Sequence, residues 1–418
     1  MKIALHWQIL ISIFLAVIAG LFTTEESQLF GVLLMEVYQF FGTLFLSALK
    51  MIIVPLIVAS IIASIASLGS NNNLGKLGLK TISFYLISSL LAILAGLLVV
   101  NITTPGIIDG QPAKDSLTLF VDEAGLENNL EKIDGRGAGD ISAIFLRMVP
   151  PNIVEAAAQG QMLGLIFFSV LFGLCMTRIN GEYQQVLNRF WHGVADTMIE
   201  MTWLIMKFAP IGVFALVAKT ITITGLAAFK PMLVFFFTVS AALFIHMFIT
   251  MPVLMRLTGK ITIKNHFQAM TPALLTAFST ASSSATLPLT MECAEKRAGI
   301  SRKTSSFVLP LGATVNMDGT ALYECVAAMF IAQAYGLDLS FATQFTVVFV
   351  ALLTSIGVAG IPAASLVAIA VILGAIGLPL EGIGLLMVTD RILDMMRTAV
   401  NVFSDSCAAA VIASSENS

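Results

Sequence analysis

The last apolar stretch of the chain, 382–413, contains a segment rich in polar side chains, TDRILDMMRTAVNVFSDS (389–406). Five of them recur at spacings of three and four: Asp394, Arg397, Thr398, Asn401 and Asp405. Residues at these spacings lie on one face of a helix, and charges within membrane segments are rare and usually functional. An isolated Asp394–Arg397 pair would indicate helix packing alone, whereas a stripe of five polar groups favours a site for a polar ligand.

A second polar group lies within LPLGATVNMDGTALYE (309–324). The run NMDG joins Asn, Asp and Gly, which are poor helix formers, and therefore predicts a broken helix. The carbonyl oxygens freed near Asn316, together with the Asp318 carboxylate, suit a hard monovalent cation. The alternative is a kink around a buried, hydrogen-bonded Asp318. A second amide and carboxylate in another apolar segment, Asn401 and Asp405, favour the cation site.

Catalytic chemistry has little support in the sequence. The serine-rich run STASSSATLP (279–288) lies in no G-x-S-x-G motif, and H-E-x-x-H is absent. The histidines are scattered: His6, His192, His246 and His266. The cysteines have no paired spacing: Cys175, Cys293, Cys325 and Cys407. We expect no enzyme activity, no transition-metal site and no cofactor, and an intramembrane protease is a remote reading.

The composition indicates that lipid surrounds the chain. Of 418 residues, 57% are hydrophobic and 11% are charged, with a mean hydropathy of +0.93, far from the values of a soluble domain. The net charge is -3, and no basic run alternates with aromatic residues, so we expect no nucleic-acid partner.

The apolar stretches predict an all-α polytopic membrane protein. Because a spanning helix needs about 20 apolar residues, we expect eight spans: 6–23, 36–67, 79–103, 141–177, 185–217, 228–256, 303–336 and 382–413. The first is followed by no small-residue cleavage site, so we interpret it as a span and not as a signal peptide.

Two further apolar stretches, 265–296 and 341–378, are divided by tips rich in small residues. The tips are STASSSATLP and SIGVAGIPAAS (355–365). Each arm has about 15 residues, roughly 22 Å, which is short of a bilayer core of about 30 Å. We therefore expect two re-entrant hairpins, whose unpaired tip backbone is tolerable only inside protein or against a water-filled cavity.

The positive charges predict the orientation of the spans. They fall in alternate loops: Lys2, Lys76, Lys80, Arg178, Arg189, Arg256, Lys260, Lys264, Lys296, Arg297, Arg302 and Lys303. These loops should be cytoplasmic, as should both termini, whereas the connector 104–140 should be extracellular or periplasmic. The hairpins then enter from opposite sides as an inverted pair, the layout of a transporter. A channel with SIGVAG as its filter is the rival reading; a gated ligand site accounts better for the arginine on the polar stripe.

Six motifs carry a resemblance to a known family: KMIIVPLI (50–57), FAPIGVFAL (208–216), SSSATLP (282–288), LPLGATVNMDGTALYE (309–324), SIGVAGIPAA (355–364) and LDMMRTAVNVFSD (393–405). The chain resembles the glutamate/neutral amino acid transporters, also called dicarboxylate/amino acid:cation symporters, nearly end to end. The resemblance implies an inverted-repeat homotrimer with an elevator mechanism. Its scaffold would comprise 1–78 and 141–222, and its transport domain 79–103 and 223–418.

The resemblance also implies the roles of individual residues. The substrate would be held by Ser282, Ser283, Thr320, Gly360, Ile361, Asp394, Arg397, Thr398 and Asn401. Asp394 would bind the amino group and Arg397 the side-chain carboxylate, which a guanidinium grips with two parallel hydrogen bonds. One sodium site would use Gly312, Asn316, Asn401 and Asp405; a second Thr314, Met317, Ser355, Ile356 and Val358; a third Tyr85, Ser88, Ser89, Asn316 and Asp318.

Three positions bear on substrate and coupling. Glutamate transporters of the family usually carry a second arginine where this chain has Ala281 or Met395, so Asp394 is expected to lack its customary partner. Glu324 matches a glutamate of relatives coupled to protons and potassium. It lies in an apolar helix with no cation beside it in the sequence, where burial favours the neutral carboxyl group. It is therefore a proton carrier candidate, and a permanently protonated, hydrogen-bonded Glu324 is the alternative.

We therefore expect a symporter of glutamate and aspartate in the plasma (cell inner) membrane. Sodium gradients would drive it, as would proton gradients through Glu324, and the resemblance implies potassium as a further coupling ion. A symporter of another amino acid or of a small dicarboxylate, and an ion channel, remain alternatives.

Overall fold

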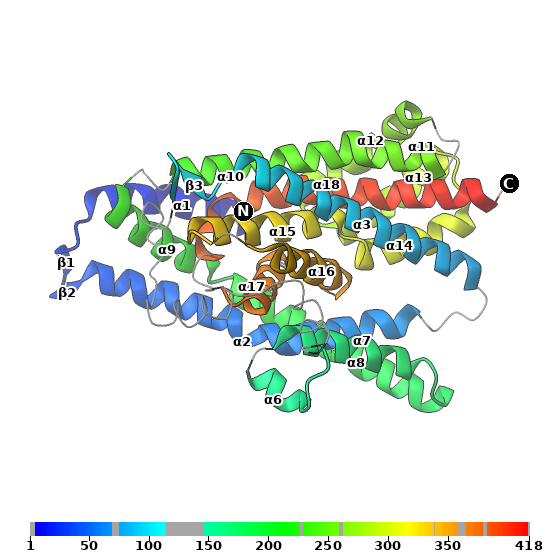
Figure 1. Cartoon of the computed structure of the whole chain (residues 1–418), viewed down its shortest axis with the longest axis horizontal. Coiled ribbons are helices and arrows are strands. Elements are labelled where there is room, and N and C mark those ends of the chain that lie inside the picture. The colour runs from blue at the N-terminus through cyan, green and yellow to red at the C-terminus, as the bar shows by residue number, and fades with distance from the viewer. Residues whose placement is uncertain are drawn as a thin grey trace.

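The computed structural model describes residues 5–68, 75–113, 146, 148–159, 161–225, 229–258, 262–337, 339–357, 364–378 and 383–416, and these are mostly helical (Figure 1). The strands in this part of the chain form two tight antiparallel hairpins, β1 (Gln28–Leu29) with β2 (Val32–Leu33) and β3 (Ile107–Ile108) with β4 (Gln111–Pro112). Both two-residue loops have positive φ at each position, as type I′ turns require. The predicted connector 104–140 lies mostly outside the described residues.

One group of helices comes from residues 5–224: α1 (Leu5–Phe22), α2 (Leu34–Leu68), α6 (Ile153–Ala158), α7 (Met162–Met176), α8 (Gly181–Met206) and α9 (Ala209–Thr224). α1 packs on α9, and α2 packs on α7, α8 and α9. The approach of α2 to α9 needs Gly212, because a Cβ there would overlap the ring of Phe45. In Figure 1, α2, α7 and α8 lie along one long side of the molecule.

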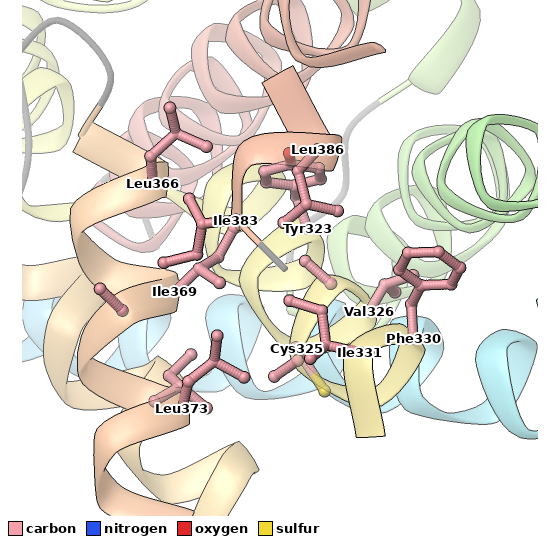
Figure 2. Packing of buried hydrophobic residues seen from close by; sticks show 14 of the residues in the cluster. Tyr323, Cys325, Val326, Phe330, Ile331, Leu366, Ile369, Leu373, Ile383 and Leu386 are labelled. Atoms are coloured by element: carbon pink, nitrogen blue, oxygen red, sulfur yellow. The ribbon is translucent and has the colours of Figure 1, made fainter. Parts of the chain in front are cut away.

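The other group is α3 (Gly75–Thr103), α10 (Phe229–Ile245), α11 (Met251–Thr258), α12 (Ile263–Thr280), α13 (Ser283–Lys296), α14 (Arg302–Val315), α15 (Asp318–Ala334), α16 (Phe341–Gly357), α17 (Ala364–Ile376) and α18 (Ile383–Glu416). α15 lies at its centre and contacts α3, α10, α16, α17 and α18. Every residue of α15 is buried except the half-buried Thr320. Figure 2 shows its apolar side chains facing those of α17.

Two helices in the described part of the chain are long and apolar enough to cross a membrane alone, Gly78–Thr103 and Phe229–Thr258. The second contains a π-helical turn, η2 (His246–Thr250). The stretch expected as one span at 185–217 is instead two helices, α8 and α9, bent by 52°. Pro210 lies in the first turn of α9, where a proline is tolerated but cannot continue the preceding helix. The expected total of eight spans stays a prediction.

Two of the expected interruptions lie within the described residues, and both occur at the predicted positions. In the stretch 265–296, α12 ends and α13 begins around Ala281, which adopts a left-handed conformation with φ of 49°. α16 and α17 occupy the stretch 341–378, and the tip between them, 358–363, lies outside the described residues. The predicted break at NMDG is confirmed, because α14 ends at Val315 and α15 begins at Asp318.

Candidate functional site

The first half of α18 carries four charged residues, Asp390, Arg391, Asp394 and Arg397, here called the arginine cluster. Arg397 is only 1% exposed, and its Nη2 donates to Oδ1 of Asp390 and to Oδ1 of Asp394, each at 3.0 Å. Arg391 Nη1 lies 3.6 Å from Oδ2 of Asp394. The predicted proximity of Asp394 and Arg397 is thus confirmed.

Arg397 also faces α15. Its Cζ lies 3.9 Å from the ring centroid of Tyr323, a cation–π contact that fixes the plane of the guanidinium. Within the described residues, Nε and Nη1 of Arg397 have no hydrogen-bond partner. A buried guanidinium with donors to spare suits a planar anion such as a carboxylate.

Glu324, the next residue of α15, is fully buried. Its Oε2 accepts a hydrogen bond of 2.9 Å from Oγ1 of Thr354 on α16, and its Oε1 has no partner in the described part of the chain. The arginine cluster lies within electrostatic reach, through Arg397. Although no cation lies beside Glu324 in the sequence, the fold brings Arg397 against the neighbouring Tyr323.

A second group, the deep carboxylate cluster, surrounds the break between α14 and α15. We define it by Ser88, Ser89, His246, Asn316, Asp318, Ser404 and Asp405. Asp318 is the centre of the cluster: Oδ1 accepts from Ser89 at 2.6 Å and from Ser88 at 3.3 Å, and Oδ2 accepts from Ser404 at 2.6 Å. The His246 Nε2 lies 3.2 Å from the same Oδ2.

Asn316 joins the two carboxylates of this cluster. Its Nδ2 donates to Oδ1 of Asp405 at 2.9 Å and to Oγ of Ser404 at 3.0 Å, and its Oδ1 accepts from Ser88 at 3.4 Å. Gly312 packs so closely on Asp405 that a Cβ there would collide with its carboxylate. Tyr85 lies beside it and donates to the Val308 carbonyl at 2.7 Å. The structure thus gathers members of the predicted first and third sodium groups.

The chemistry of this cluster fits a small cation. Asp318 and Asp405 are 0% and 2% exposed, and among the described residues neither carboxylate forms an ion pair with lysine or arginine. A buried carboxylate without a positive partner is costly, so it either holds a proton or binds a cation. Oxygen-rich surroundings of hydroxyl, amide and carboxylate groups suit hard ions.

Asn401 lies on α18 between Arg397 of the first cluster and Ser404 of the second, and it contacts the start of α15. Its Oδ1 accepts from the Gly319 backbone N–H at 2.8 Å, and its Nδ2 donates to Thr320 Oγ1 at 3.2 Å and contacts the Met317 sulfur at 3.1 Å. A Cβ on Gly319 would lie 2.7 Å from the Arg397 carbonyl oxygen. Only glycine therefore lets the start of α15 approach α18 this closely.

Other predicted residues have separate surroundings. Ser282 caps α13 by accepting from the Ala285 N–H at 3.2 Å, and Ser283 is buried beside it. Thr398 donates to the Asp394 carbonyl within α18. Of the second sodium group, Thr314 and Ser355 donate to carbonyls of their own helices. Val358, Gly360 and Ile361 lie outside the described residues, as does the side chain of Ile356.

Sequence reasoning missed several members of these clusters: Asp390, Tyr323, Thr354, Ser404 and His246. Asp390 precedes Arg397 by seven residues, a helical spacing that could have revealed it; the others come from separate helices or carry no sequence signal. Asp394 lacks the customary arginine at position 281 or 395, but Arg391, one turn earlier, pairs with it instead.

Comparison with known proteins identifies the family of the chain. The sodium:dicarboxylate symporter family matches residues 5–415. A proton/sodium-glutamate symport protein of Bacillus caldotenax is 37% identical over 98% of this chain and 94% of its own length. A proton/glutamate-aspartate symporter of Escherichia coli is 34% identical over 100% and 94%. Excitatory amino acid transporter 3 of Mus musculus is 32% identical over 97% and 85%. The chain therefore belongs to the sodium:dicarboxylate symporter family, whose members are membrane-embedded secondary transporters and not enzymes.

Proposed function

We propose that this chain is a symporter that carries glutamate and aspartate across the membrane together with sodium, and with protons through Glu324. The observation that carries the proposal is Arg397, which is buried in α18 with Nε and Nη1 unpaired among the described residues. Its position beside a carboxylate cluster without a fixed counterion supports coupling of an anionic substrate to cations. The names of the relatives from Bacillus caldotenax and Escherichia coli agree with it.

In this proposal Arg397 binds the side-chain carboxylate of the substrate and Asp394 its amino group, while Thr398, Asn401, Thr320 and the two hairpin tips complete the pocket. Sodium binds at the deep carboxylate cluster. Because Asn401 belongs to the polar stripe of α18 and hydrogen-bonds with the start of α15, an ion that orders Asn401 or Gly319 also orders the substrate site. Such a link makes each ligand raise the affinity for the other.

We also propose the larger architecture that the resemblance implies. The group around α1, α2, α7, α8 and α9 forms a trimerising scaffold, and the group around α15 and α18 moves as an elevator. Most helix contacts lie within one group, with smaller contacts between the groups, such as α9 with α18 and α2 with α16, and this supports the division. Large apolar side chains exposed on α1 and α2, such as Phe14, Phe22 and Phe40, provide surface for lipid or for a second protomer. Both termini are cytoplasmic. Molar mass in detergent and surface labelling of single cysteines test these points.

The test of function is uptake of radiolabelled L-aspartate and L-glutamate into proteoliposomes that contain the full chain. We expect uptake with an inward sodium gradient, further stimulation by an inward proton gradient, and none when choline replaces sodium. Uptake that is unchanged after every inward cation gradient is removed would contradict coupling.

The second candidate is a symporter of another amino acid or a small dicarboxylate. It is favoured by Ala281 and Met395, which stand where the family's glutamate transporters usually carry an arginine, and by the dicarboxylate in the family description. Competition of aspartate uptake by succinate, malate and neutral amino acids decides between them.

A further inference from the structure

Arg391 holds the oxygen of Asp394 that Arg397 does not reach. Asp394 Oδ1 accepts from Arg397 at 3.0 Å, and Oδ2 lies 3.6 Å from Arg391 Nη1. The longer distance is that of an ion pair and exceeds that of a hydrogen bond. The side chains of Arg391 and Asp394 are 22% and 35% exposed, so solvent screens their attraction only in part.

The charges of the arginine cluster balance only when Arg391 is included. Asp390 and Asp394 both direct an oxygen to Nη2 of Arg397, and one guanidinium neutralises one of these two carboxylates. Arg391 supplies the second positive charge. Without it, the cluster would carry a net charge of one negative unit beside the donors Nε and Nη1 of Arg397.

This balance matters for an acidic amino acid, which carries one net negative charge at neutral pH. A neutral cluster lets such a substrate approach Arg397, whereas a cluster with net negative charge repels it. The repulsion is strong because the cluster is partly buried, and charges interact more strongly there than in water. A neutral amino acid, with no net charge, experiences little of this repulsion.

A role in helix stability alone explains Arg391 less well. An acidic residue followed by a basic one stabilises a helix better than the reverse order, and here arginine comes first. Arg391 Nε also has no hydrogen-bond partner in the part of the chain that the structure describes. The contact between the Arg391 guanidinium and the Asp394 carboxylate is thus mainly electrostatic.

We propose that Arg391 is a positioning residue that sets substrate specificity: it holds Asp394 and neutralises the arginine cluster, so that the site accepts a substrate with net negative charge. This inference rests on the proposed function and on Asp394 and Arg397 lining the substrate site.

The test compares Arg391→Gln and Arg391→Lys in the full chain reconstituted in proteoliposomes. Arg391→Gln should raise the KM for aspartate and glutamate about tenfold, equivalent to about 1.4 kcal/mol, and leave the maximal rate near that of the parent. Arg391→Lys keeps the charge and should restore most of the affinity. Inhibition of uptake by a neutral amino acid, L-serine, should not weaken in Arg391→Gln.

The matched control is Lys296→Gln, which removes the exposed pair of Lys296 with Glu292 on α13 (2.9 Å) and changes the net charge equally. Its KM should equal that of the parent. Arg391→Ala is a second neutral variant if glutamine destabilises the chain, and the Tm of each variant reports folding.

An unchanged KM in Arg391→Gln, equal losses in the Gln and Lys variants, or parallel losses for acidic and neutral amino acids would overturn the role of Arg391. If the parent itself takes up no acidic amino acid, the proposed function fails and this inference with it. A parent that transports aspartate, combined with an unchanged Arg391→Gln, overturns only the inference.

Discussion

The arginine cluster and the deep carboxylate cluster each contain two carboxylates, but they balance them differently. In the first, Asp390 and Asp394 are 16% and 35% exposed and face two arginines of the same helix. In the second, Asp318 and Asp405 are 0% and 2% exposed and, within the described residues, have only hydroxyl, amide and imidazole neighbours. The less solvated pair thus has no permanent counterion.

In the proposed function, this difference separates a site for an anion from a site for cations. Permanent guanidinium groups leave donors for a substrate carboxylate, whereas buried carboxylates without a fixed positive charge require a proton or a mobile cation. Both clusters include residues of α18, and between them the start of α15 packs on α18, where Gly319 contacts Asn401 and the Arg397 backbone. Under the proposed function, we expect a ligand bound at one cluster to alter the geometry at the other and so to couple ion and substrate binding.

The largest expected effect comes from removing the central carboxylate of the deep cluster. Asp318→Asn keeps the shape of the side chain but loses the negative charge that attracts sodium. The hydroxyl groups of Ser88, Ser89 and Ser404, which donate to the carboxylate, would then face an amide. The sodium concentration for half-maximal aspartate uptake should rise at least ~100-fold, beyond the 10- to 100-fold typical of groups that only support a metal ligand. Asp109→Asn, at an exposed ion pair with Lys230, is the control. Normal sodium dependence in Asp318→Asn would remove the cation role of this cluster.

Arg397→Ala tests the other cluster. Losing a charge-assisted hydrogen bond costs about 1.5–3 kcal/mol, roughly 10- to 150-fold in affinity, and more if the substrate carboxylate stays buried and unpaired. Binding of aspartate and glutamate should therefore fall by at least that factor, while the protein remains folded and neutral amino acids bind relatively better. Undiminished affinity for both acidic substrates would show that Arg397 is structural.

His246 offers a finer test of the deep cluster, because it orients Asp318 from the π-helical turn in the span that α10 begins. His246→Leu removes the contact and should raise the sodium concentration for half-maximal uptake about tenfold, as for other groups that position a metal ligand. His246→Gln, which can still donate a hydrogen bond, should lose less.

His266→Leu is the matched control for that experiment. This histidine is also buried, but its Nε2 contacts Ser406 at 2.9 Å and no carboxylate. Equal shifts in sodium dependence for the His246 and His266 variants would mean that His246 acts through packing alone.

The smallest expected effect on exchange concerns Glu324, which accepts a hydrogen bond from the Thr354 hydroxyl. Glu324→Gln keeps a hydrogen-bonding side chain of the same shape but cannot release a proton. It should retain aspartate exchange and lose both the pH dependence of net uptake and any stimulation by internal potassium. The same pH profile and potassium response as in the parent would make Glu324 a packing residue.

The sequence predicted those parts of the site that depend on spacing within one segment. The stripe of α18 and the break at NMDG follow from helical periodicity and from residues that disfavour helix, and both occur in the structure. Contacts between distant helices have no such signal. Tyr323 under Arg397, His246 and Ser404 on Asp318, and the two-helix form of 181–224 depend on tertiary packing. The pairing of Arg391 with Asp394 follows the same spacing rule, because the two residues are three positions apart on α18.

The most direct test of whether cation and substrate bind at separate clusters is to measure sodium binding without substrate. Sodium that binds only the folded protein raises Tm with concentration, and choline chloride at equal ionic strength provides the baseline. The account predicts that Arg397→Ala keeps the sodium-dependent rise of the parent and loses only the further rise with aspartate, whereas Asp318→Asn loses the sodium response itself. If both variants kept the sodium response, or both lost it, the assignment of cation and substrate to separate clusters would be contradicted.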